Sequence, residues 1–444
     1  MHEIRVGLLG LGTIGTGVAR ILLEQQELMS RRLGKRVRLV AAADRDLSRD
    51  RGLDFSGVRL SDDAMAVACA DDVDLVVELI GGYEPARSFV VEALSRGKHV
   101  VTANKALIAK HGEELFPLAT ANDAALGFEA AVGGGIPCLK ALREGLAANA
   151  ITSVHGILNG TCNFILTKME REGADYAGVL REAQELGYAE ADPTFDVEGI
   201  DTAHKLAILA AMAWGAKIRF EDVYTEGISH ITAADIAAAA ELGYRIKLLG
   251  IAKPHGAPGS PEAIEMRVHP TLTPVDAQIA QVSDSYNAVM ISGDFVEHTM
   301  YFGRGAGERP TASAVVADIM DIARVCAAGG DAVEQLPPPM GFTAEARREI
   351  PTLPMADVVC EYYLRLMVRD EPGVIAAVTS ILADHRISLE AVVQKERSAA
   401  RSVPVVMLTH ETREGNLQAA ISRITSLPSV EDGVLILRKE TFGA

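Results

Sequence analysis

The sequence contains few cysteines, and their spacing suggests no pairing. The five are spread over the chain without a CxxC motif, at Cys69, Cys138, Cys162, Cys326 and Cys360. Scattered cysteines argue against a disulfide framework and against a zinc site, because both need grouped thiols. We therefore expect reduced thiols and a cytoplasmic location.

Long hydrophobic runs and an excess of positive charge are also missing. The longest apolar stretch, residues 206–214, is far too short to cross a membrane. The first residues lead directly into an apolar strand, without the pattern of a secretory leader. Lysine and arginine number 43 against 60 acidic residues, which gives a net charge of −17. Because such a surface repels phosphate backbones and anionic lipid, we expect neither nucleic acid nor a membrane as a partner.

A chain of 444 residues is long enough for about three domains. Alternating strand and helix patterns over roughly the first 130 residues predict a doubly wound parallel sheet. Strand and helix patterns of a different order follow, and two glycine-rich turns and a proline-rich stretch separate the parts. We predict a Rossmann domain at 1–135, an α+β substrate and dimerisation domain at 136–302, a return segment with linker at 303–350, and a ferredoxin-like domain at 356–444.

The individual elements are predicted from the same patterns. Strands are expected at 4–9, 37–43, 73–80, 99–102, 151–158 and 263–268, and helices at 18–33, 85–96, 176–186, 200–213 and 311–327.

A GxGxxG motif, Gly10, Gly12 and Gly15, follows the first strand and opens a helix. In this position Gly10 permits the tight turn, Gly12 lets the backbone approach a pyrophosphate, and Gly15 packs helix against strand. A similar turn can occur without a ligand, but the strand-to-helix context favours dinucleotide binding.

The second strand ends at two residues with opposite coenzyme preferences. Asp44 suits the ribose hydroxyls of NAD, whereas Arg45 suits the 2′-phosphate of NADP. The sequence therefore leaves the choice between NAD and NADP open. The acidic residue comes later than the usual spacing of about 20 residues, which we attribute to a long first helix.

Acidic residues, glycines and a proline crowd into residues 183–205, between two predicted helices. Asp201 and Lys205 are four residues apart, so they lie on one face of the second helix. This spacing is typical of a surface ion pair, yet the same face continues into the apolar residues 206–209. We therefore expect Lys205 to be partly buried, which lowers the pKa of a lysine towards the range useful in proton transfer.

Residues 183–205 resemble the homoserine dehydrogenase signature at every spaced position, and the likeness extends over nearly the whole chain. Residues 103–107 are similar to the second lysine motif of that family, and residues 303–318 resemble its segment returning to the nucleotide domain. The resemblance implies reversible NAD- or NADP-dependent oxidation of L-homoserine to L-aspartate 4-semialdehyde. The chain has no room for a complete kinase domain, so it resembles the monofunctional type.

The resemblance also implies roles for the residues at matching positions. Lys205 exchanges the proton at the substrate oxygen and Lys105 assists it, as loss of a hydride from a carbinol carbon requires. Glu190 binds the substrate ammonium, Asp201 binds substrate and steadies the lysines, and Asp196 is a further substrate contact. The coenzyme contacts are expected from Gly10, Gly12, Thr13, Ile14, Gly15, Asp44, Arg45, Thr102, Lys105, Gly187 and Gly303.

Residues 129–136 resemble the monovalent-cation loop of the family. The resemblance implies a sodium site made by the Glu129 carboxylate and the carbonyls of Val132, Gly134 and Ile136, and oxygen-only ligation is typical of hard cations. A plain glycine turn between two domains explains the same residues equally well.

Two residues invite other catalytic interpretations. His204 points about 100° away from Lys205 on the helix, so we expect it to serve packing or to lie on the surface. Cys162 belongs to the segment 159–164, which also matches the family and is a candidate lining of the substrate pocket. We expect a structural thiol there and not a nucleophile.

In the last part of the chain, strands are expected at 362–368, 387–394, 403–409 and 434–438, with a helix to about residue 384 after the first strand. This part resembles an ACT domain, a small fold that binds amino acids, often between paired copies. Gly373 allows close backbone approach, the start of the next helix can hold a carboxylate, and Asp370 can take an ammonium. The end product of the homoserine branch suggests threonine as the effector, and deletion beyond about residue 355 should leave activity and remove inhibition. The alternative is a domain that only joins subunits.

Two other functions are compatible with these patterns. One is a dehydrogenase of a related amino-acid semialdehyde, and the other is a non-catalytic amino-acid sensor. The sensor would require loss of Glu190, Asp201 or Lys205, and all three are present. We expect a homodimer or homotetramer.

Overall fold

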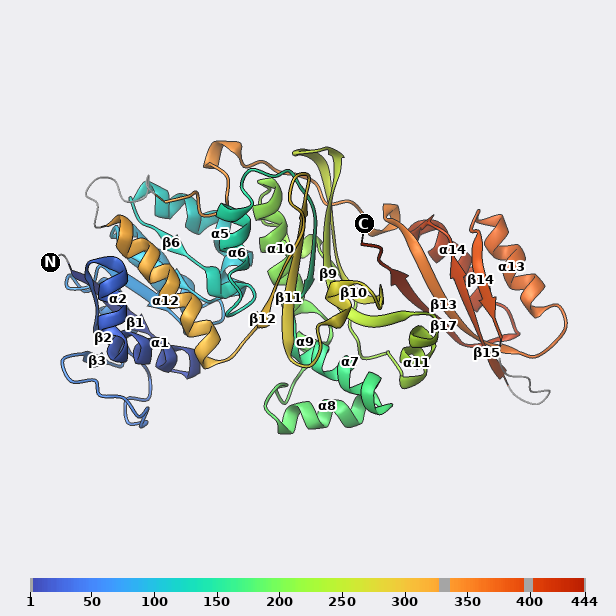
Figure 1. Cartoon of the computed structure of the whole chain (residues 1–444), viewed down its shortest axis with the longest axis horizontal. Helices are drawn as coiled ribbons and strands as arrows, with labels where there is room; N and C mark the ends of the chain where they lie inside the picture. The colour runs from blue at the N-terminus through green and yellow to red at the C-terminus, as the bar shows by residue number, and fades with distance from the viewer. Residues whose placement is uncertain (1–2, 327–335, 395–401, 443–444) are drawn as a thin grey trace.

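The computed structural model describes residues 3–326, 336–394 and 402–442. The predicted helix end at residue 327 and residues 327–335 of the predicted linker lie outside these ranges. Figure 1 shows the N-terminal unit at one end of the molecule, a central unit, and the C-terminal unit at the other end. No helix of the described parts is long and apolar enough to cross a membrane.

The N-terminal unit is built on a six-stranded parallel sheet with the order β3-β2-β1-β4-β5-β6. Its inner strands β1 and β4 are buried at most positions and are largely apolar, because helices cover both faces. This confirms the predicted doubly wound sheet. The strands are β1 (Glu3–Leu9), β2 (Arg36–Ala43), β3 (Arg59–Ser61), β4 (Leu75–Glu78), β5 (His99–Thr102) and β6 (Leu126–Gly127).

The single helix predicted after the glycine motif is in fact two helices, because the chain breaks at Gln25 with φ −111°. The last helix of the unit, α12, returns from a distant part of the sequence and packs on α1. Gly17 permits this approach, since a Cβ there would lie 2.8 Å from Cγ of Glu308. The helices are α1 (Thr13–Glu24), α2 (Gln26–Leu33), α3 (Ala64–Cys69), α4 (Ala86–Ser95), α5 (Lys105–Ala121) and α12 (Glu308–Val325).

The central unit is an antiparallel sheet with the order β12-β11-β7-β9-β10. The strand predicted at 263–268 is the inner part of β10, which is 15 residues long and forms a hairpin with β9. The strands are β7 (Ile151–Ile157), β9 (Tyr244–Ala257), β10 (Ser260–Pro274), β11 (Tyr286–Gly293) and β12 (Glu297–Arg304), and the helices are α7 (Gly160–Glu172), α8 (Tyr176–Glu185), α9 (Thr194–Val197), α10 (Ile200–Trp214) and α11 (Ala233–Glu241).

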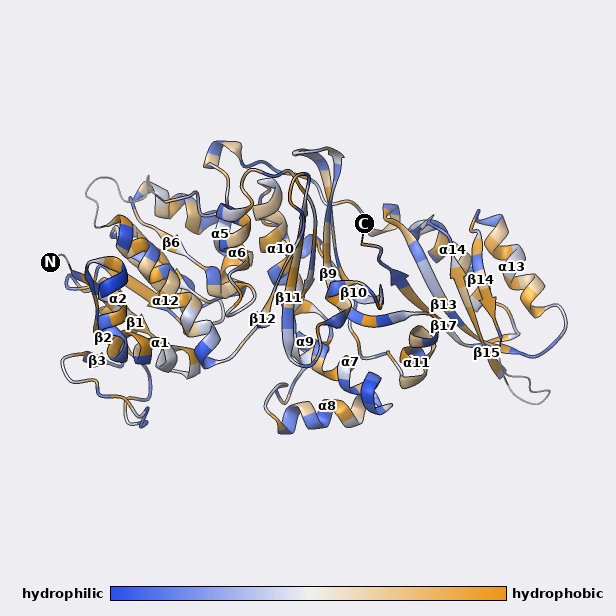
Figure 2. Ribbon diagram, in the orientation of Figure 1, coloured by the Kyte–Doolittle hydropathy of each residue, from blue (hydrophilic) through white to orange (hydrophobic). Residues whose placement is uncertain are grey.

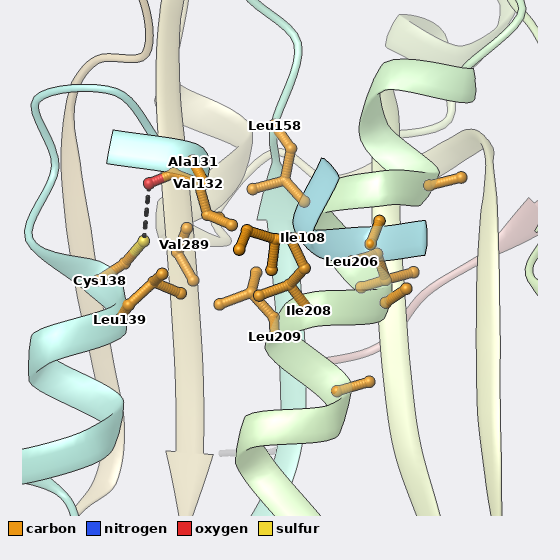
Figure 3. Close-up of a cluster of buried hydrophobic side chains, with 14 of the residues drawn as sticks. Ile108, Ala131, Val132, Cys138, Leu139, Leu158, Leu206, Ile208, Leu209 and Val289 are labelled. Carbon is orange, nitrogen blue, oxygen red and sulfur yellow. Dashed lines mark hydrogen bonds between the residues drawn. The ribbon is translucent and has the colours of Figure 1, made fainter. Parts of the chain in front are cut away.

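Helix α10 is buried on all sides, because the sheet covers one side and α5 packs against another. Figure 3 shows Leu206, Ile208 and Leu209 of α10 in one cluster with Ile108 of α5. Val132, from the predicted cation loop, belongs to the same cluster. The core between the two units therefore fixes the starts of α5 and α10 relative to each other.

The C-terminal unit has the sheet order β17-β13-β15-β14, all antiparallel, and two helices. This is the predicted ferredoxin-like order. Figure 2 shows its helices with apolar residues along their length. The elements are β13 (Val359–Arg369), α13 (Val374–Asp384), β14 (Leu389–Val393), β15 (Ser402–Thr409), β16 (Thr412–Arg413), α14 (Glu414–Thr425) and β17 (Val430–Lys439).

The central and C-terminal sheets are joined through their edge strands, a feature that the sequence patterns do not predict. β17 pairs in parallel with β10, with Thr271 opposite Arg438 and Leu272 opposite Lys439. The end of the chain thus returns to the middle of the molecule (Figure 1).

Candidate active site

The glycine turn between β1 and α1 has the geometry that a dinucleotide site needs. Gly10 has φ +96°, and a Cβ at Gly15 would lie 1.9 Å from the carbonyl oxygen of Gly10. A Cβ at Gly12, by contrast, would meet nothing within 4 Å, and Gly12 caps α1 without a side-chain hydrogen bond. Thr13 is exposed beside it and Ile14 is half-buried. The start of α1 is therefore open to a phosphate group.

Asp44 is tied to the glycine turn. Its Oδ2 accepts a hydrogen bond of 2.6 Å from the Leu11 amide, and its Oδ1 lies 3.3 Å from the guanidinium of Arg51. The Arg51 side chain is only 5% exposed and also donates to the Leu11 carbonyl. Sequence reasoning missed Arg51, because nothing in its spacing marks it. The predicted Arg45 is exposed next to Asp44.

The end of β5 leads into α5 through a chain of short hydrogen bonds. Thr102 is fully buried and donates to Glu78 at 2.7 Å, and its oxygen accepts from the Asn104 amide. Asn104 caps α5, so Lys105 stands in the first turn of that helix. The predicted coenzyme residue Thr102 thus fixes the backbone that leads from β5 into α5.

Lys105 and Lys205 converge on Asp201 at the start of α10. Lys205 donates from Nζ to Asp201 Oδ2 at 2.7 Å and to the Leu158 carbonyl at 2.7 Å. Lys105 Nζ lies 3.1 Å from Asp201 Oδ1. Both Asp201 and Lys205 are buried, as expected for Lys205, whereas a third of the Lys105 side chain is exposed.

The two lysines have pKa values shifted in opposite directions. Burial lowers the pKa of Lys205, although Asp201 works against the shift. The Asp201 carboxylate raises the pKa of Lys105 and outweighs desolvation there. Burial alone would raise the pKa of Asp201, but the two lysines hold it below its usual range. The arrangement therefore supplies one ammonium group that releases its proton more easily and one that keeps it.

Asn159 connects the acidic residues of the site. Its amide donates to Asp196 Oδ1 at 2.7 Å and to Asp201 Oδ2 at 3.0 Å, while its oxygen caps α7 at Cys162. Burial raises the pKa of Asp196, which lies beside these groups. Sequence reasoning noted residues 159–164 as pocket lining but did not identify Asn159 or the Leu158 carbonyl, which lie more than 40 residues from Asp201 and Lys205 in the chain.

The loop between α8 and α10 places Glu190 and Gly187 at the surface of the site. Glu190 is close enough to contribute, after Asp201 and Asp196, to the raised pKa of Lys105. Gly187 has φ +75° and open space where a Cβ would stand. Phe195 of α9 lies with the centre of its ring 6.0 Å from Lys105 Nζ.

His204 and Cys162 have the structural roles that we expected. His204 is 1% exposed between the rings of Phe195 and Phe220, so it serves packing, and burial lowers its pKa. Cys162 is buried with its Sγ 3.2 Å from the Asp196 carbonyl, and burial raises the pKa of the thiol well above its ordinary value. Neither residue is prepared as an acid, a base or a nucleophile.

The predicted cation loop contains a buried carboxylate among backbone groups. Glu129 accepts hydrogen bonds from the amides of Leu139 and Lys140, and Asp318 lies close by, bonded to the Glu129 amide. The Val132 carbonyl accepts a bond of 3.5 Å from Cys138 Sγ (Figure 3).

The described parts of the chain hold no group of three His, Cys, Asp or Glu side chains arranged for a metal. Gly303 lies beside this loop, since a Cβ at Gly303 would be 3.3 Å from Ile136.

The predicted regulatory residues lie away from this site, in the C-terminal unit. Gly373 precedes α13 with φ +94° and open space around it, and Asp370 accepts a hydrogen bond from Gln394 at 3.3 Å.

Three sequence families match the chain. The family Homoserine dehydrogenase, NAD binding domain, matches residues 10–129, the family Homoserine dehydrogenase matches residues 137–320, and the ACT domain family matches residues 362–429.

Individual relatives match over most or all of the chain. A homoserine dehydrogenase of Neisseria gonorrhoeae is 46% identical over 442 residues, which is 100% of each chain. The crystal structure of a homoserine dehydrogenase from Thiobacillus denitrificans is similar with a TM-score of 0.93 and 50% identity, covering 100% of this chain and 99% of that one. A hyperthermophilic archaeal homoserine dehydrogenase in complex with NADPH has a TM-score of 0.60 and 27% identity, covering 72% of this chain and 97% of that one.

Proposed function

The chain belongs to the homoserine dehydrogenase family of NAD(P)-dependent oxidoreductases, and on this premise we propose how its residues divide the interconversion of L-homoserine and L-aspartate 4-semialdehyde. One observation carries the proposal. Lys105 and Lys205 bind the two oxygens of one buried carboxylate, and their pKa values shift in opposite directions.

Lys205 is the residue that moves the proton. The nicotinamide coenzyme, when bound, accepts the hydride from the carbinol carbon of homoserine or returns it to the aldehyde. In oxidation, neutral Lys205 takes the hydroxyl proton as the C–O bond becomes a carbonyl. In reduction, protonated Lys205 gives a proton to the oxygen of the aldehyde. The lowered pKa of Lys205 suits both directions, because an acid–base group works best near the operating pH.

Lys105 stays cationic and stabilises negative charge on the same oxygen. Asp201 holds both ammonium groups in place, Asn159 fixes Asp201 and Asp196, and Asp196 contacts substrate. Glu190, exposed at the rim, binds the substrate ammonium. The coenzyme lies along Gly10, Gly12, Thr13, Ile14 and Gly15, and the further contacts are from Thr102, Lys105, Gly187 and Gly303.

Both NAD and NADP are accepted in this proposal. Asp44 and Arg45 lie at the same strand end with opposite preferences. The NADPH bound in the archaeal relative supports NADP as one of the two.

A sodium ion binds at Glu129 with the carbonyls of Val132, Gly134 and Ile136. The fit rests on two buried acids, Glu129 and Asp318, because burial raises their pKa values to about 8 and about 7 and a bound cation would stabilise their ionised forms. The ion holds the loop between the nucleotide domain (1–135) and the substrate domain (136–302), and residues 305–318 of the return segment pack on this loop.

The ACT domain (356–444) regulates the enzyme by binding threonine near Asp370 and Gly373. The assembly is a homodimer or homotetramer. All five cysteines lie in the described ranges and are free, which supports a location in the reducing cytoplasm.

Absorbance of the reduced nicotinamide tests the activity directly. Aspartate semialdehyde, with NADPH or NADH, should cause oxidation of the coenzyme by the wild-type protein and not by the Lys205→Ala variant. Faster turnover of another amino-acid semialdehyde would reassign the substrate, and no turnover at all would favour a sensor.

A further inference from the structure

The joint between the C-terminal and central units contains a buried arginine. Arg438 lies on β17 opposite Thr271 of β10, and its side chain is only 2% exposed. A buried guanidinium requires several partners, because burial of an unpaired charge is costly. The partners of Arg438 show which parts of the molecule it holds together.

Arg438 joins an acid of its own domain to an acid of the other. Its Nε and Nη2 bind the two oxygens of Glu414 at 2.9 and 2.7 Å, and its Nη1 donates to Glu226 Oε2 at 2.7 Å. The planar fork of arginine permits this double use, which a lysine could not reproduce. Tyr224 donates to Glu226 at 3.0 Å and accepts from Arg438 at 3.1 Å, and His230 Nε2 lies 3.3 Å from the other oxygen of Glu226.

Glu226 belongs to a short segment, residues 224–228, that lies directly on the turn before α10. The Ile228 amide donates to the Val197 carbonyl at 2.9 Å. Gly227 leaves no room for a side chain, since a Cβ there would be 2.5 Å from the same carbonyl. The contact is therefore between two backbones, and a shift of one displaces the other.

The turn at residues 197–199 connects the two acids of the active site. Asp196 precedes the turn and Asp201 follows it, and Asn159 binds both. Gly199, with φ +81°, is also closely packed, since a Cβ there would be 2.9 Å from Val268 of β10. A movement of segment 224–228 would therefore reach Asp196 and Asp201 without crossing the nucleotide domain.

We propose that Arg438 is a positioning residue for the substrate site, acting through Glu226 and segment 224–228 on the turn that carries Asp196 and Asp201. The ACT domain thereby affects the binding of the amino-acid substrate and leaves coenzyme binding unchanged. The inference rests on the proposed function for the roles of Asp196 and Asp201. An effector on the ACT domain would act by the same route.

Steady-state kinetics of Glu226→Ala tests the proposal. The KM for homoserine should rise about tenfold, in the range of typical coupling between sites, while the KM for the coenzyme stays within about twofold. Glu226→Gln, which retains an acceptor for Arg438, should recover most of the loss. Arg438→Lys should raise the KM at least as much as Glu226→Ala, because it also weakens the bonds to Glu414. Adding Glu226→Ala to Arg438→Lys should raise the KM little further, because the bond between Arg438 and Glu226 is already lost. If Glu226→Ala does not fold, Arg438→Lys alone decides.

The matched control is Arg365→Met. Arg365 of β13 pairs with Asp235 of α11 across the same joint, but this pair does not touch the turn at 197–199. Its KM for homoserine should stay at the wild-type value. An unchanged KM in folded Glu226→Ala, or an equal rise in Arg365→Met, would overturn the proposal.

The proposed function is tested separately by Asp201→Asn and Lys205→Ala. If these two variants lose most of their turnover while Glu226→Ala retains the wild-type KM, only the positioning role fails. If they stay fully active while Glu226→Ala raises the KM, the assigned catalytic roles fail and the coupling stands.

Discussion

Lys105 and Lys205 bind different oxygens of the Asp201 carboxylate, Lys105 at 3.1 Å and Lys205 at 2.7 Å. The two lysines come from separate units, Lys105 from the first turn of α5 and Lys205 from the second turn of α10. The carboxylate therefore sets the distance between two ammonium groups that would otherwise repel each other. Lys205 is buried and Lys105 is partly exposed. Beside the same carboxylate, the pKa of Lys205 is therefore lowered and that of Lys105 is raised.

Replacement of Lys205 should remove proton transfer without removing the coenzyme site. Lys205→Ala should lower kcat by roughly 10²–10⁴, the usual contribution of a general acid–base group. Lys205→Arg should be nearly as slow, because arginine keeps the charge but does not deprotonate. Coenzyme affinity, measured by fluorescence titration, should stay near wild type in both. Lys217→Ala, at an exposed lysine paired with Glu349, is the control. A folded Lys205→Ala variant with normal turnover would exclude Lys205 from the mechanism.

The pH profile should depend on the pKa of Lys205. Homoserine oxidation needs neutral Lys205, so its kcat/KM should rise with pH and level off above this pKa, which burial holds below the ordinary 10.5. Aldehyde reduction needs the protonated form and should fall over the same range. Asp201 raises the pKa of Lys205, so Asp201→Asn should move the inflection to lower pH, whatever the height of the profile.

The control for this profile is Asp192→Asn, an exposed acid of the same loop that binds Thr194. Its inflection should coincide with that of the wild type. An Asp201→Asn profile that does not move, or that moves to higher pH, would show that another group governs the rate.

Coenzyme preference should respond oppositely to changes at Asp44 and Arg45. Asp44→Ala should weaken NAD relative to NADP, because the acceptor for the ribose hydroxyls is lost, and Arg45→Ala should do the reverse. The measurement is the ratio of kcat/KM for the two coenzymes. Asp44→Ala also removes the hydrogen bond from the Leu11 amide, which could weaken the binding of both coenzymes equally. The ratio of the two kcat/KM values is not affected by such an equal loss. Asp46→Ala is the neighbouring control, and equal ratios in all variants would remove the second strand from coenzyme selection.

Sodium should stabilise the fold through Glu129. Wild-type protein in sodium chloride should melt at a higher temperature than in an equal concentration of choline chloride, since a bound ion stabilises only the native state. Glu129→Gln should abolish the difference, and Glu144→Gln, at a nearby partly exposed acid, should retain it. Equal melting temperatures of the wild type in both salts would leave residues 129–136 as a plain glycine turn.

The sequence predicts those features that depend on residues close together in the chain. Hydrophobic periodicity identifies α10 within one residue, and the spacing of Asp201 and Lys205 alone indicates their shared face. Asn159 was missed because it reaches Asp196 and Asp201 across 37 and 42 residues of chain, and no local pattern records such a contact. Arg51 lies only seven residues from Asp44, but its bond to the Leu11 carbonyl spans 40 residues, and its spacing from Asp44 matches no motif. The pairing of β10 with β17 was also missed, because the two strands are far apart in the sequence. Each of them also pairs with a strand of its own unit, β10 with β9 and β17 with β13.

This joint argues against one expectation from the sequence. Deletion beyond about residue 355 was expected to leave activity intact. However, Arg267 of β10 is 1% exposed and pairs with Glu440, which also bonds to His155. Removal of the C-terminal unit would leave Arg267 with fewer partners inside the central sheet, so we expect truncation to destabilise the substrate domain. Point substitutions in the ligand site are the cleaner test of regulation.

Threonine should inhibit the wild-type enzyme, and Asp370→Ala should relieve this inhibition while leaving kcat unchanged. Asp370 would bind the ammonium of threonine, and a hydrogen bond to a charged group contributes about 1.5–3 kcal/mol, so half-inhibition should need about ten- to hundredfold more threonine. Asp384→Ala, at an exposed acid of the same domain paired with Arg423, is the control and should keep wild-type inhibition. Calorimetry on both variants separates loss of binding from loss of coupling, because Asp370→Ala should bind weakly, whereas Glu226→Ala should bind normally and respond less. If threonine binds neither the wild type nor any variant, the ACT domain serves assembly and the regulatory proposal is wrong.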